Sequence, residues 1–347
     1  KGIDGFYKGK VSDLLIKQMM NLGGFLTHAD LEKYRSVERE PVVGTYRRYK
    51  IISMAPPSSG GIALIQLLNI LENFDIEKDE WGSSRYMHRL VEAMKYVYAD
   101  RTYHLGDVDF YPVPIDGLIS KEYAREIFER IKDNAVPSAE IFTGDPLKYY
   151  ESMETTHYSV YDSLGNAVSV STTLNSAFGS KVVVEGAGFL LNNEMDDFSE
   201  KPGVPNQFGL LGTDANAIEP GKRMLSSMTP TIVLKDDEPY IIIGSPGGST
   251  IITVVLQVIL NCIEFNMNIQ EAINAPRIHH QWQPDKIFFE KFSINNDAME
   301  NLLIMGHTFS DMLDKFKILG LAQGIMIDDN VIYGASDPRG SGSAEGY

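Results

Sequence analysis

The sequence is poor in cysteine, in cationic residues and in long apolar runs. Cys262 is the single cysteine among 347 residues, which excludes an intrachain disulfide framework and a cysteine-based metal cluster. The most apolar stretch, Ile251 to Leu260, is interrupted by Gln257 and is far shorter than the ~20 residues that span a bilayer. The 31 Lys and Arg against 47 Asp and Glu give a net charge of −16. This acidity disfavours nucleic acid and acidic membrane surfaces as partners.

Common catalytic and cofactor motifs are missing too. The sequence has no G-x-S-x-G elbow, no Walker loop, no G-x-G-x-x-G after a strand and no H-E-x-x-H. Only His279 and His280 are adjacent among the scattered histidines, and neighbours in sequence on a helix do not share a face. We therefore expect no metal site and no cofactor.

The residues that are present indicate a globular chain whose two halves differ in their pattern of expected secondary structure. The 43% apolar and 22% charged residues supply a sizeable core. Residues 1–132 are mainly helical in pattern, with apolar residues at helical spacing on Val11, Leu14, Leu15, Met19 and Leu22, and again on Met87, Leu90, Val91, Met94 and Val97. Further helices are expected at Ile62–Leu71 and Lys121–Lys132, and one strand at Thr45–Met54.

A polar, irregular stretch from about residue 133 to 154 separates this half from one dominated by strands. Alternating runs around Tyr158 and Val168 flank Asp162-Ser163-Leu164-Gly165-Asn166, which is typical of a hairpin. Other expected strands are Phe189–Leu191, Thr231–Leu234, Tyr240–Ile243, Lys286–Glu290, Ile325–Ile327 and Val331–Tyr333, and expected helices are Ile251–Phe265, Ile269–Asn274 and Ala298–Met305. The order suits an α+β fold in which helices stack outside sheets.

The sharpest chemical feature is Thr155-Thr156-His157-Tyr158-Ser159, where the polar stretch meets the first strand of the second half. A hydroxyl is a poor nucleophile until a base removes its proton, and a threonine freed at its own α-amine by chain cleavage can use that amine as the base. Threonine pairs are common in strands, however, so residue type alone favours a structural role.

Three further segments could complete a site, although each has an ordinary alternative. The glycines of Ser245-Pro246-Gly247-Gly248-Ser249 could present N–H groups at a helix N-terminus as an oxyanion hole, or form a simple turn. The acidic stretch from Asn192 to Asp197 could receive an ammonium group, or be a solvated loop. Ser226 and Ser227 could donate to a carboxylate, or merely cap a turn.

Together and in this order, these segments resemble the γ-glutamyltranspeptidase family of N-terminal nucleophile hydrolases. The matching blocks run along nearly the whole chain: Tyr98-Ala99-Asp100-Arg101, Leu105-Gly106-Asp107, Thr155 to Val160, Gly165 to Val168, Thr173-Leu174-Asn175, Leu190 to Phe198, Leu225 to Met228, Gly244 to Gly248 and Tyr333 to Arg339.

The resemblance implies a four-layer αββα sandwich and a precursor that cleaves itself at the Glu154–Thr155 bond. Residues 1–154 would then be the C-terminal part of a large subunit and residues 155–347 a small subunit, and the two would form one composite domain. Family members carry a longer N-terminal region with an arginine for the substrate carboxylate. We therefore expect a truncated chain with crippled substrate binding, and Arg101 is not assigned that arginine's role.

By the same resemblance, Thr155 is the nucleophile of a γ-glutamyltransferase and glutathione hydrolase, and Thr173 orients it. Gly247 and Gly248 form the oxyanion hole. Asn175, Glu194 and Asp197 hold the substrate α-amine, and Ser226 with Ser227 hold its α-carboxylate. The segment Pro202 to Thr213 is a lid, with Phe208 where many relatives place a tyrosine.

The resemblance leaves some alternatives open. A poly-γ-glutamate depolymerase, a cephalosporin acylase, or an unprocessed and inert chain would share the same blocks. The implied partners are glutathione or other γ-glutamyl compounds, amino-acid or peptide acceptors, and the two subunits from one precursor. The implied location is the periplasm or the cell surface.

Overall fold

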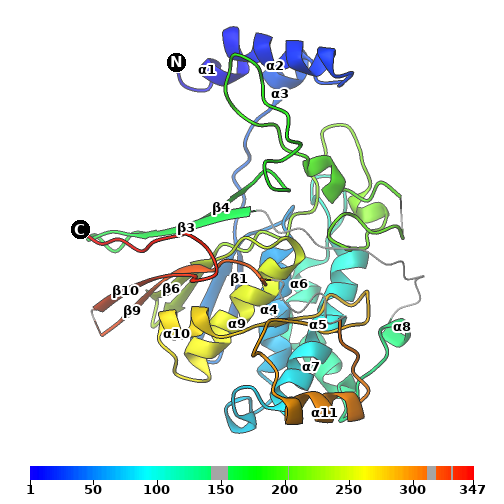
Figure 1. Cartoon of the computed structure of the whole chain (residues 1–347), viewed down its shortest axis with the longest axis vertical. Coiled ribbons are helices and arrows are strands. Elements are labelled where there is room, and N and C mark those ends of the chain that lie inside the picture. The colour runs from blue at the N-terminus through cyan, green and yellow to red at the C-terminus, as the bar shows by residue number, and fades with distance from the viewer. Residues whose placement is uncertain (142–154, 202, 311–317, 330) are drawn as a thin grey trace.

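A six-stranded antiparallel sheet forms the centre of the fold (Figure 1). The computed structural model describes residues 1–141, 155–201, 203–310, 318–329 and 331–347. The strands lie in the order β1-β2-β5-β6-β9-β10, with bounds Val42–Tyr46, Tyr49–Ser53, Thr231–Lys235, Glu238–Gly244, Gln323–Asp328 and Val331–Ser336. Strands from both halves of the chain therefore share one sheet.

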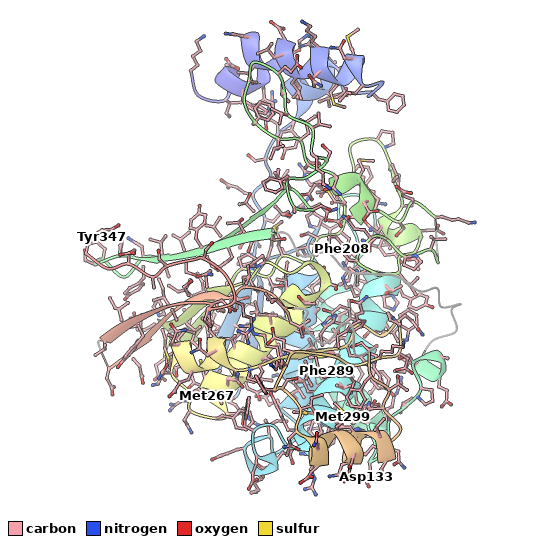
Figure 2. All side chains as sticks on the ribbon, in the orientation of Figure 1. Asp133, Phe208, Met267, Phe289, Met299 and Tyr347 are labelled. Carbon is pink, nitrogen blue, oxygen red and sulfur yellow. The ribbon has the colours of Figure 1, made fainter. Side chains whose placement is uncertain are left out.

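Helices cover one face of this sheet. All residues of α4 (Gly60–Leu71) are buried, as expected for a mainly apolar helix that is packed on every side; its two polar residues, Gln66 and Asn69, donate to Asp100 and to the Ile119 carbonyl. It contacts β1, α5 (Ser84–His104), α7 (Lys121–Arg130) and α9 (Ile251–Ile263). The side chains of these elements fill the space between the helices and the sheet (Figure 2).

The hairpin of β3 (Thr155–Tyr161) and β4 (Ala167–Thr173) lies on the other face, against β6 and β9. Its inward side is polar: the hydroxyl of Ser169 donates to the carbonyl of Ile243 at 3.1 Å. The buried ring of His157 occupies the space that a side chain at Gly244 would need, since a Cβ there would lie 2.2 Å from the ring. Burial lowers the pKa of His157 to about 4, so the ring is neutral in this layer.

The first helices form a separate small cluster. Helices α1 (Asp4–Tyr7), α2 (Lys10–Asn21) and α3 (His28–Lys33) lie away from the main sheet (Figure 1), and Leu15, Ile16 and Leu31 pack with Val184. The remaining elements are α6 (Ile115–Leu118), α8 (Ser138–Ile141), α10 (Ile269–Asn274), α11 (Asn296–Ile304), β7 (Ile278–His279) and β8 (Phe288–Phe289).

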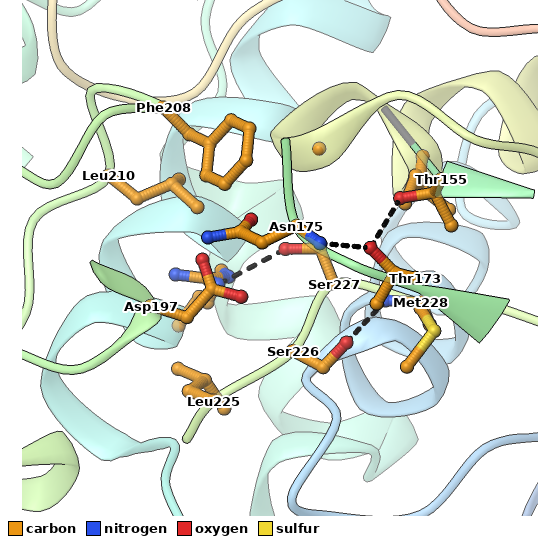
Figure 3. Close-up of a pocket in the computed structure, with 13 residues that line it drawn as sticks. Thr155, Thr173, Asn175, Asp197, Phe208, Leu210, Leu225, Ser226, Ser227 and Met228 are labelled. Atoms are coloured by element: carbon orange, nitrogen blue, oxygen red, sulfur yellow. Dashed lines mark hydrogen bonds between the residues drawn. The ribbon is translucent and has the colours of Figure 1, made fainter. Parts of the chain in front are cut away.

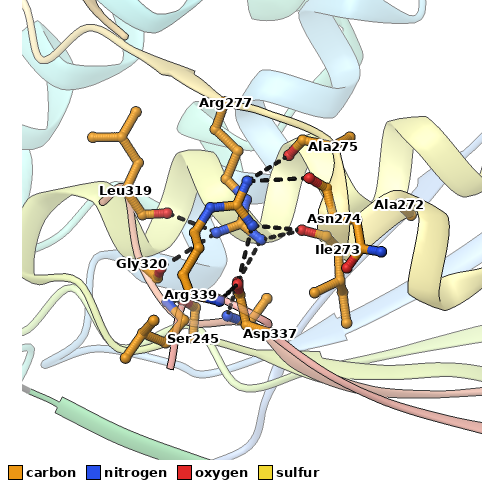
Figure 4. Close-up of polar contacts among 12 residues, drawn as sticks. Ser245, Ala272, Ile273, Asn274, Ala275, Arg277, Leu319, Gly320, Asp337 and Arg339 are labelled. Carbon is orange, nitrogen blue, oxygen red and sulfur yellow. Dashed lines mark hydrogen bonds and ion pairs between the residues drawn. The ribbon is translucent and has the colours of Figure 1, made fainter. Parts of the chain in front are cut away.

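A buried ion-pair network joins the end of β10 to α10 (Figure 4). The Arg277 guanidinium lies 2.7 Å from the Asp337 carboxylate and donates to the carbonyls of Leu319 and Ile273. Arg339 contacts the same carboxylate at 3.0 Å and reaches Glu290 at 2.7 Å. The segment after β10 is thereby fixed against the helical layer.

The predicted α+β class is confirmed, and most elements lie where the patterns placed them. The described residues contribute three layers: helices, the six-stranded sheet and the β3–β4 hairpin. The prediction of a single strand at Thr45–Met54 is wrong. Arg47 adopts a φ of 53° and turns the chain there, so that β1 and β2 form a hairpin. Phe189–Leu191 forms only an isolated bridge, and Lys286–Glu290 only the two residues of β8.

Two further expectations concern the chain as a whole. The chain boundary predicted between residues 1–154 and 155–347 lies at the edge of the described residues, because Glu154 is outside them and Thr155 is within them. In the described part of the chain, no helix combines the length and apolar character needed to cross a bilayer.

Candidate active site

A pocket opens where the start of β3 meets the glycine turn before α9 (Figure 3). Its walls come from both halves of the chain, and the lining residues are Arg101, Thr155, Thr173, Asn175, Asp197, Phe208, Leu210, Leu225, Ser226, Ser227, Met228, Gly248 and Ile251. Most residues that the sequence analysis assigns to the site therefore lie around one cavity.

Thr155 and Thr173 meet because they are directly opposite one another in the β3–β4 ladder. The hydroxyl of Thr155 donates to the hydroxyl oxygen of Thr173 over 3.4 Å. The backbone N–H of Asn175 donates to the same Thr173 oxygen at 2.8 Å. The strand register and the turn after β4 together orient the Thr155 hydroxyl.

The glycine turn borders the pocket beside Thr155. Gly247 and Gly248 have φ values of 145° and 53°, a region that favours glycine. They precede the helix α9, whose N-terminus suits an incoming negative charge. Gly248 lines the pocket directly, and Gly247 is held in the turn by the Thr250 N–H, which donates to its carbonyl at 3.0 Å.

The 3-10 turn Glu194–Asp197 begins and ends with a carboxyl group, and of these two Asp197 lines the pocket. Burial, together with the charge of Glu194, raises the pKa of Asp197 to about 8. Burial also raises the pKa of Glu194 to about 7, and its Oε1 atom has no hydrogen-bond partner among the described residues. A cation bound here would relieve both effects, because an opposite charge favours the ionised form.

Ser226, Ser227 and Arg101 form the polar end of the pocket. The buried Arg101 guanidinium donates to the Ser227 hydroxyl at 3.1 Å and to the Ser59 hydroxyl at 3.0 Å. Its burial lowers its pKa to about 10, so it is still a cation at neutral pH. A positive charge with two hydroxyls is a suitable receptor for an anion.

Phe208 and Leu210 close the pocket from the loop that the sequence analysis names as a lid. The ring of Phe208 is 5% exposed and rests on Gly248, where an added Cβ would lie 2.7 Å from its Cδ1 atom. Pro202, the first residue of the predicted lid, lies outside the described residues.

The structure thus brings together around the pocket Thr155, Thr173, Asn175, Asp197, Phe208, Ser226, Ser227 and Gly248. Two predicted site residues, Gly247 and Glu194, are not among the residues that line it. The sequence analysis gave Arg101 no role at the substrate carboxylate, whereas the structure places it in the pocket wall with Ser227. The sequence analysis also missed the apolar lining by Leu225, Met228 and Ile251, although Leu225 to Met228 is one of the matching blocks.

One group of side chains in the described residues has the spacing of a metal site. Ligand atoms of His88, Glu92 and His307 lie within 4.8 Å of one another. The His88 and His307 rings already bond to each other at 2.8 Å, and Glu92 pairs with Lys95 at 2.9 Å, so these donors have partners. The structure places His279 and His280 at the end of the strand β7 and directly after it, not on a helix. The two side chains contact different partners, Gln281 and Asp285 respectively.

Comparison with known proteins gives a consistent picture along the whole chain. The family model described as gamma-glutamyltranspeptidase matches residues 1–347. A glutathione hydrolase proenzyme of Escherichia coli is 51% identical over 340 residues, which cover 97% of this chain and 58% of that protein. The chain therefore spans less than two thirds of this relative's length.

Two solved structures are similar as well. The γ-glutamyltranspeptidase from Pseudomonas nitroreducens complexed with L-DON is 48% identical, with a TM-score of 0.53, over 55% of this chain and 99% of that one. The cephalosporin acylase from Bacillus halodurans is 27% identical, with a TM-score of 0.82, over 99% of this chain and 60% of that one.

Proposed function

Because this chain belongs to the γ-glutamyltranspeptidase family, we propose that it carries the catalytic machinery of a γ-glutamyltransferase and glutathione hydrolase. One observation supports this most strongly. The Thr155 hydroxyl, bonded to Thr173, borders a pocket whose lining includes the carboxyl group of Asp197 and, with it, Arg101 and two serines. These groups match the α-amine and the α-carboxylate of a γ-glutamyl donor in charge.

In the first half-reaction, the Thr155 Oγ1 atom attacks the γ-carbonyl carbon of the donor. The hydroxyl proton passes to the α-amine of Thr155, which is free once the Glu154–Thr155 bond is cut. As the C–N bond of the donor breaks, this proton goes to the leaving amine, and a γ-glutamyl ester of Thr155 remains. Before the attack, the hydrogen bond to Thr173 holds Oγ1 in position; once the Thr155 proton has left, the Thr173 hydroxyl would take over as the donor to Oγ1.

The developing oxyanion requires donors that are fixed in advance. The turn at Gly247 and Gly248 supplies backbone N–H groups at the N-terminal end of α9, and losing one such donor typically costs on the order of 10²-fold in rate. Water then attacks the ester to give glutamate, or an amino-acid or peptide amine attacks it to give a new γ-glutamyl amide. Either attack returns the proton to Thr155 Oγ1.

The choice of a γ-glutamyl donor rests on the carboxylates. Asp197 and Glu194 lie where burial raises the pKa of each. The charge of Arg101 and a hydrogen bond from Asn175 offset this effect only in part at Asp197, and a substrate ammonium would add a further positive charge. An acylase substrate without an α-ammonium would leave the two carboxyl groups without that added charge. We therefore place a cephalosporin acylase or another amidase activity second.

Maturation and mechanism can be tested together. The wild-type protein should separate into two pieces on denaturing electrophoresis, and Thr155→Ala should remain one. Incubation with a γ-glutamyl anilide should add one γ-glutamyl group to the piece that begins at Thr155, seen by mass spectrometry after rapid acid quenching. A wild-type chain that never splits and never gains this mass would contradict the proposal. The periplasmic or cell-surface location stays a prediction, tested by cell fractionation.

A further inference from the structure

The side-chain amide of Gln281 joins the lid to the glycine turn. Gln281 is buried; its Nε2 atom donates to the backbone carbonyl of Phe208 at 3.0 Å. Its Oε1 atom accepts from the Ser249 hydroxyl at 2.7 Å. Ser249 belongs to the 3-10 turn Gly248–Thr250 that leads into α9. One side chain therefore contacts both the loop that carries Phe208 and the glycine turn.

The neighbours of Gln281 fix the orientation of its amide. A carbonyl only accepts, so Nε2 must face Phe208 and Oε1 must face Ser249 and the Nε2 atom of His279, 3.0 Å away. His279 Nε2 is then the protonated nitrogen. Its Nδ1 atom lies 2.8 Å from the Thr253 hydroxyl, whose single proton it shares with the Thr250 carbonyl at 3.0 Å. Burial lowers the pKa of His279 to about 3, which agrees with a neutral ring carrying one N–H.

The lid and the turn also touch directly. The Phe208 ring lies against Gly248, and both residues line the pocket. A displacement of the loop at Phe208 would therefore break the Gln281 bond and remove the ring from the glycine at the same time. Since buried polar groups are costly to leave unpaired, the closed arrangement is favoured as a unit.

We propose that Gln281 is a positioning residue that holds the lid closed and the glycine turn in register through one amide. Its catalytic consequence rests on the proposed function. While the γ-glutamyl ester exists, the Phe208 carbonyl bond keeps the lid over the ester and so governs the division between water and acceptor amines. The Ser249 bond keeps the turn aligned for the oxyanion.

Three variants separate these contributions. Gln281→Met has similar length and loses both bonds. Gln281→Glu keeps the acceptor for Ser249 and His279 but cannot donate to Phe208 when ionised. Gln257→Met is the matched control, because Gln257 is also a buried glutamine and donates to the carbonyls of Thr253 and Ile278, away from the lid.

The first readout is hydrogen exchange, which needs no activity. Amides in residues 203–212 should exchange about tenfold faster in both Gln281 variants, as expected for one lost hydrogen bond, and at the wild-type rate in Gln257→Met. Should Gln281→Met not fold, Gln281→Glu carries the comparison. Unchanged exchange in the Gln281 variants, or an equal acceleration in Gln257→Met, would overturn the inference.

The second readout is kinetic, normalised to the amount of acyl-enzyme formed in the burst. Gln281→Glu should change the ratio of hydrolysis to transfer and leave the acylation rate near wild type. Gln281→Met should also slow acylation about tenfold, because a misaligned oxyanion donor costs part of what a lost one does. The donor KM should stay within about twofold of wild type, because Asp197 and Ser226 are unchanged. If hydrogen exchange in residues 203–212 is faster in the Gln281 variants but the wild-type protein forms no acyl-enzyme, the positioning role is supported and the proposed function is overturned. A wild-type transfer ratio in Gln281→Glu would overturn the catalytic consequence.

Discussion

The hydroxyl oxygens of Thr155 and Thr173 lie 3.4 Å apart because the two residues are paired across the β3–β4 ladder. The hydroxyl of Thr155, the proposed nucleophile, is thus oriented by strand register. Thr172 directly precedes Thr173 on β4 and pairs with Thr156. Because successive strand residues point to opposite faces, Thr172 faces the other side of the hairpin.

Thr173→Val keeps the shape of the side chain and removes the hydrogen-bond acceptor. We expect the acylation rate to fall on the order of 10²-fold, within the range for groups that assist proton transfer or orient a nucleophile. The donor KM should change little, because the bond from Asn175 to Thr173 involves the backbone N–H of Asn175 and not its side chain. Burst kinetics with a γ-glutamyl anilide measure both quantities. Thr172→Val should behave as wild type, and equal rates in the two variants would contradict the role of Thr173.

A side chain at Gly248 should open the lid. In Gly248→Ala the new Cβ would lie 2.7 Å from Cδ1 of the Phe208 ring, and the φ of 53° is unfavourable for alanine. We expect at least a tenfold loss of acylation rate, since the oxyanion donors shift with the turn. The double variant Gly248→Ala with Phe208→Ala tests the steric part of this effect. Because the second substitution removes the clashing ring, it should recover part of the lost rate, and no recovery would show that the backbone strain alone is responsible.

Patterns of local burial made most of the fold predictable. The mainly apolar sequence of α4 and the alternation in β3 and β4 reflect the surroundings of these elements, so each could be assigned from its residues alone. The turn at Arg47 could not, because nothing in an arginine signals a φ of 53°. The hairpin β1–β2 was therefore merged into one expected strand.

The site was predictable where the resemblance supplied roles and not where it depended on distant contacts. Thr155 and Thr173 are paired by a short hairpin, whose register follows from the turn. The place of Arg101 depends on Ser59 and Ser227, which are 42 and 126 positions away. No spacing within the sequence indicates that such segments meet.

The raised pKa of Asp197, about 8, predicts a pH-dependent stability. Between pH ~4 and ~8 the unfolded carboxyl is ionised and the folded one is protonated, so the unfolded state binds fewer protons and stability falls as pH rises. Asp197→Asn removes this penalty. The variant should melt at the wild-type temperature near pH 4 and at a progressively higher temperature up to about pH 8, where the advantage levels off.

Thermal melts across this pH range, without substrate, measure the effect. The control is Asp133→Asn, an exposed aspartate at the far end of the molecule from Phe208 (Figure 2), which should parallel wild type at each pH. Asp197→Asn should also bind a γ-glutamyl donor more weakly, because the ammonium loses its charged partner. A melting difference that stays constant with pH would refute the raised pKa.

Arg277 should be a major determinant of stability, because it carries a buried charge that holds the segment after β10. Its guanidinium pairs with Asp337 at 2.7 Å and donates to the carbonyls of Leu319 and Ile273 (Figure 4). Arg277→Met fills similar space but removes one of the two cations that pair with the Asp337 carboxylate in the described structure, leaving Arg339 and the Ala322 N–H. Breaking a buried pair costs about 3–5 kcal/mol. Urea unfolding should show a loss of this size, whereas Arg125→Met, at an exposed position on α7, should lose less than about 0.5 kcal/mol. Equal stability of the two variants would mean that Arg339 supports the segment by itself.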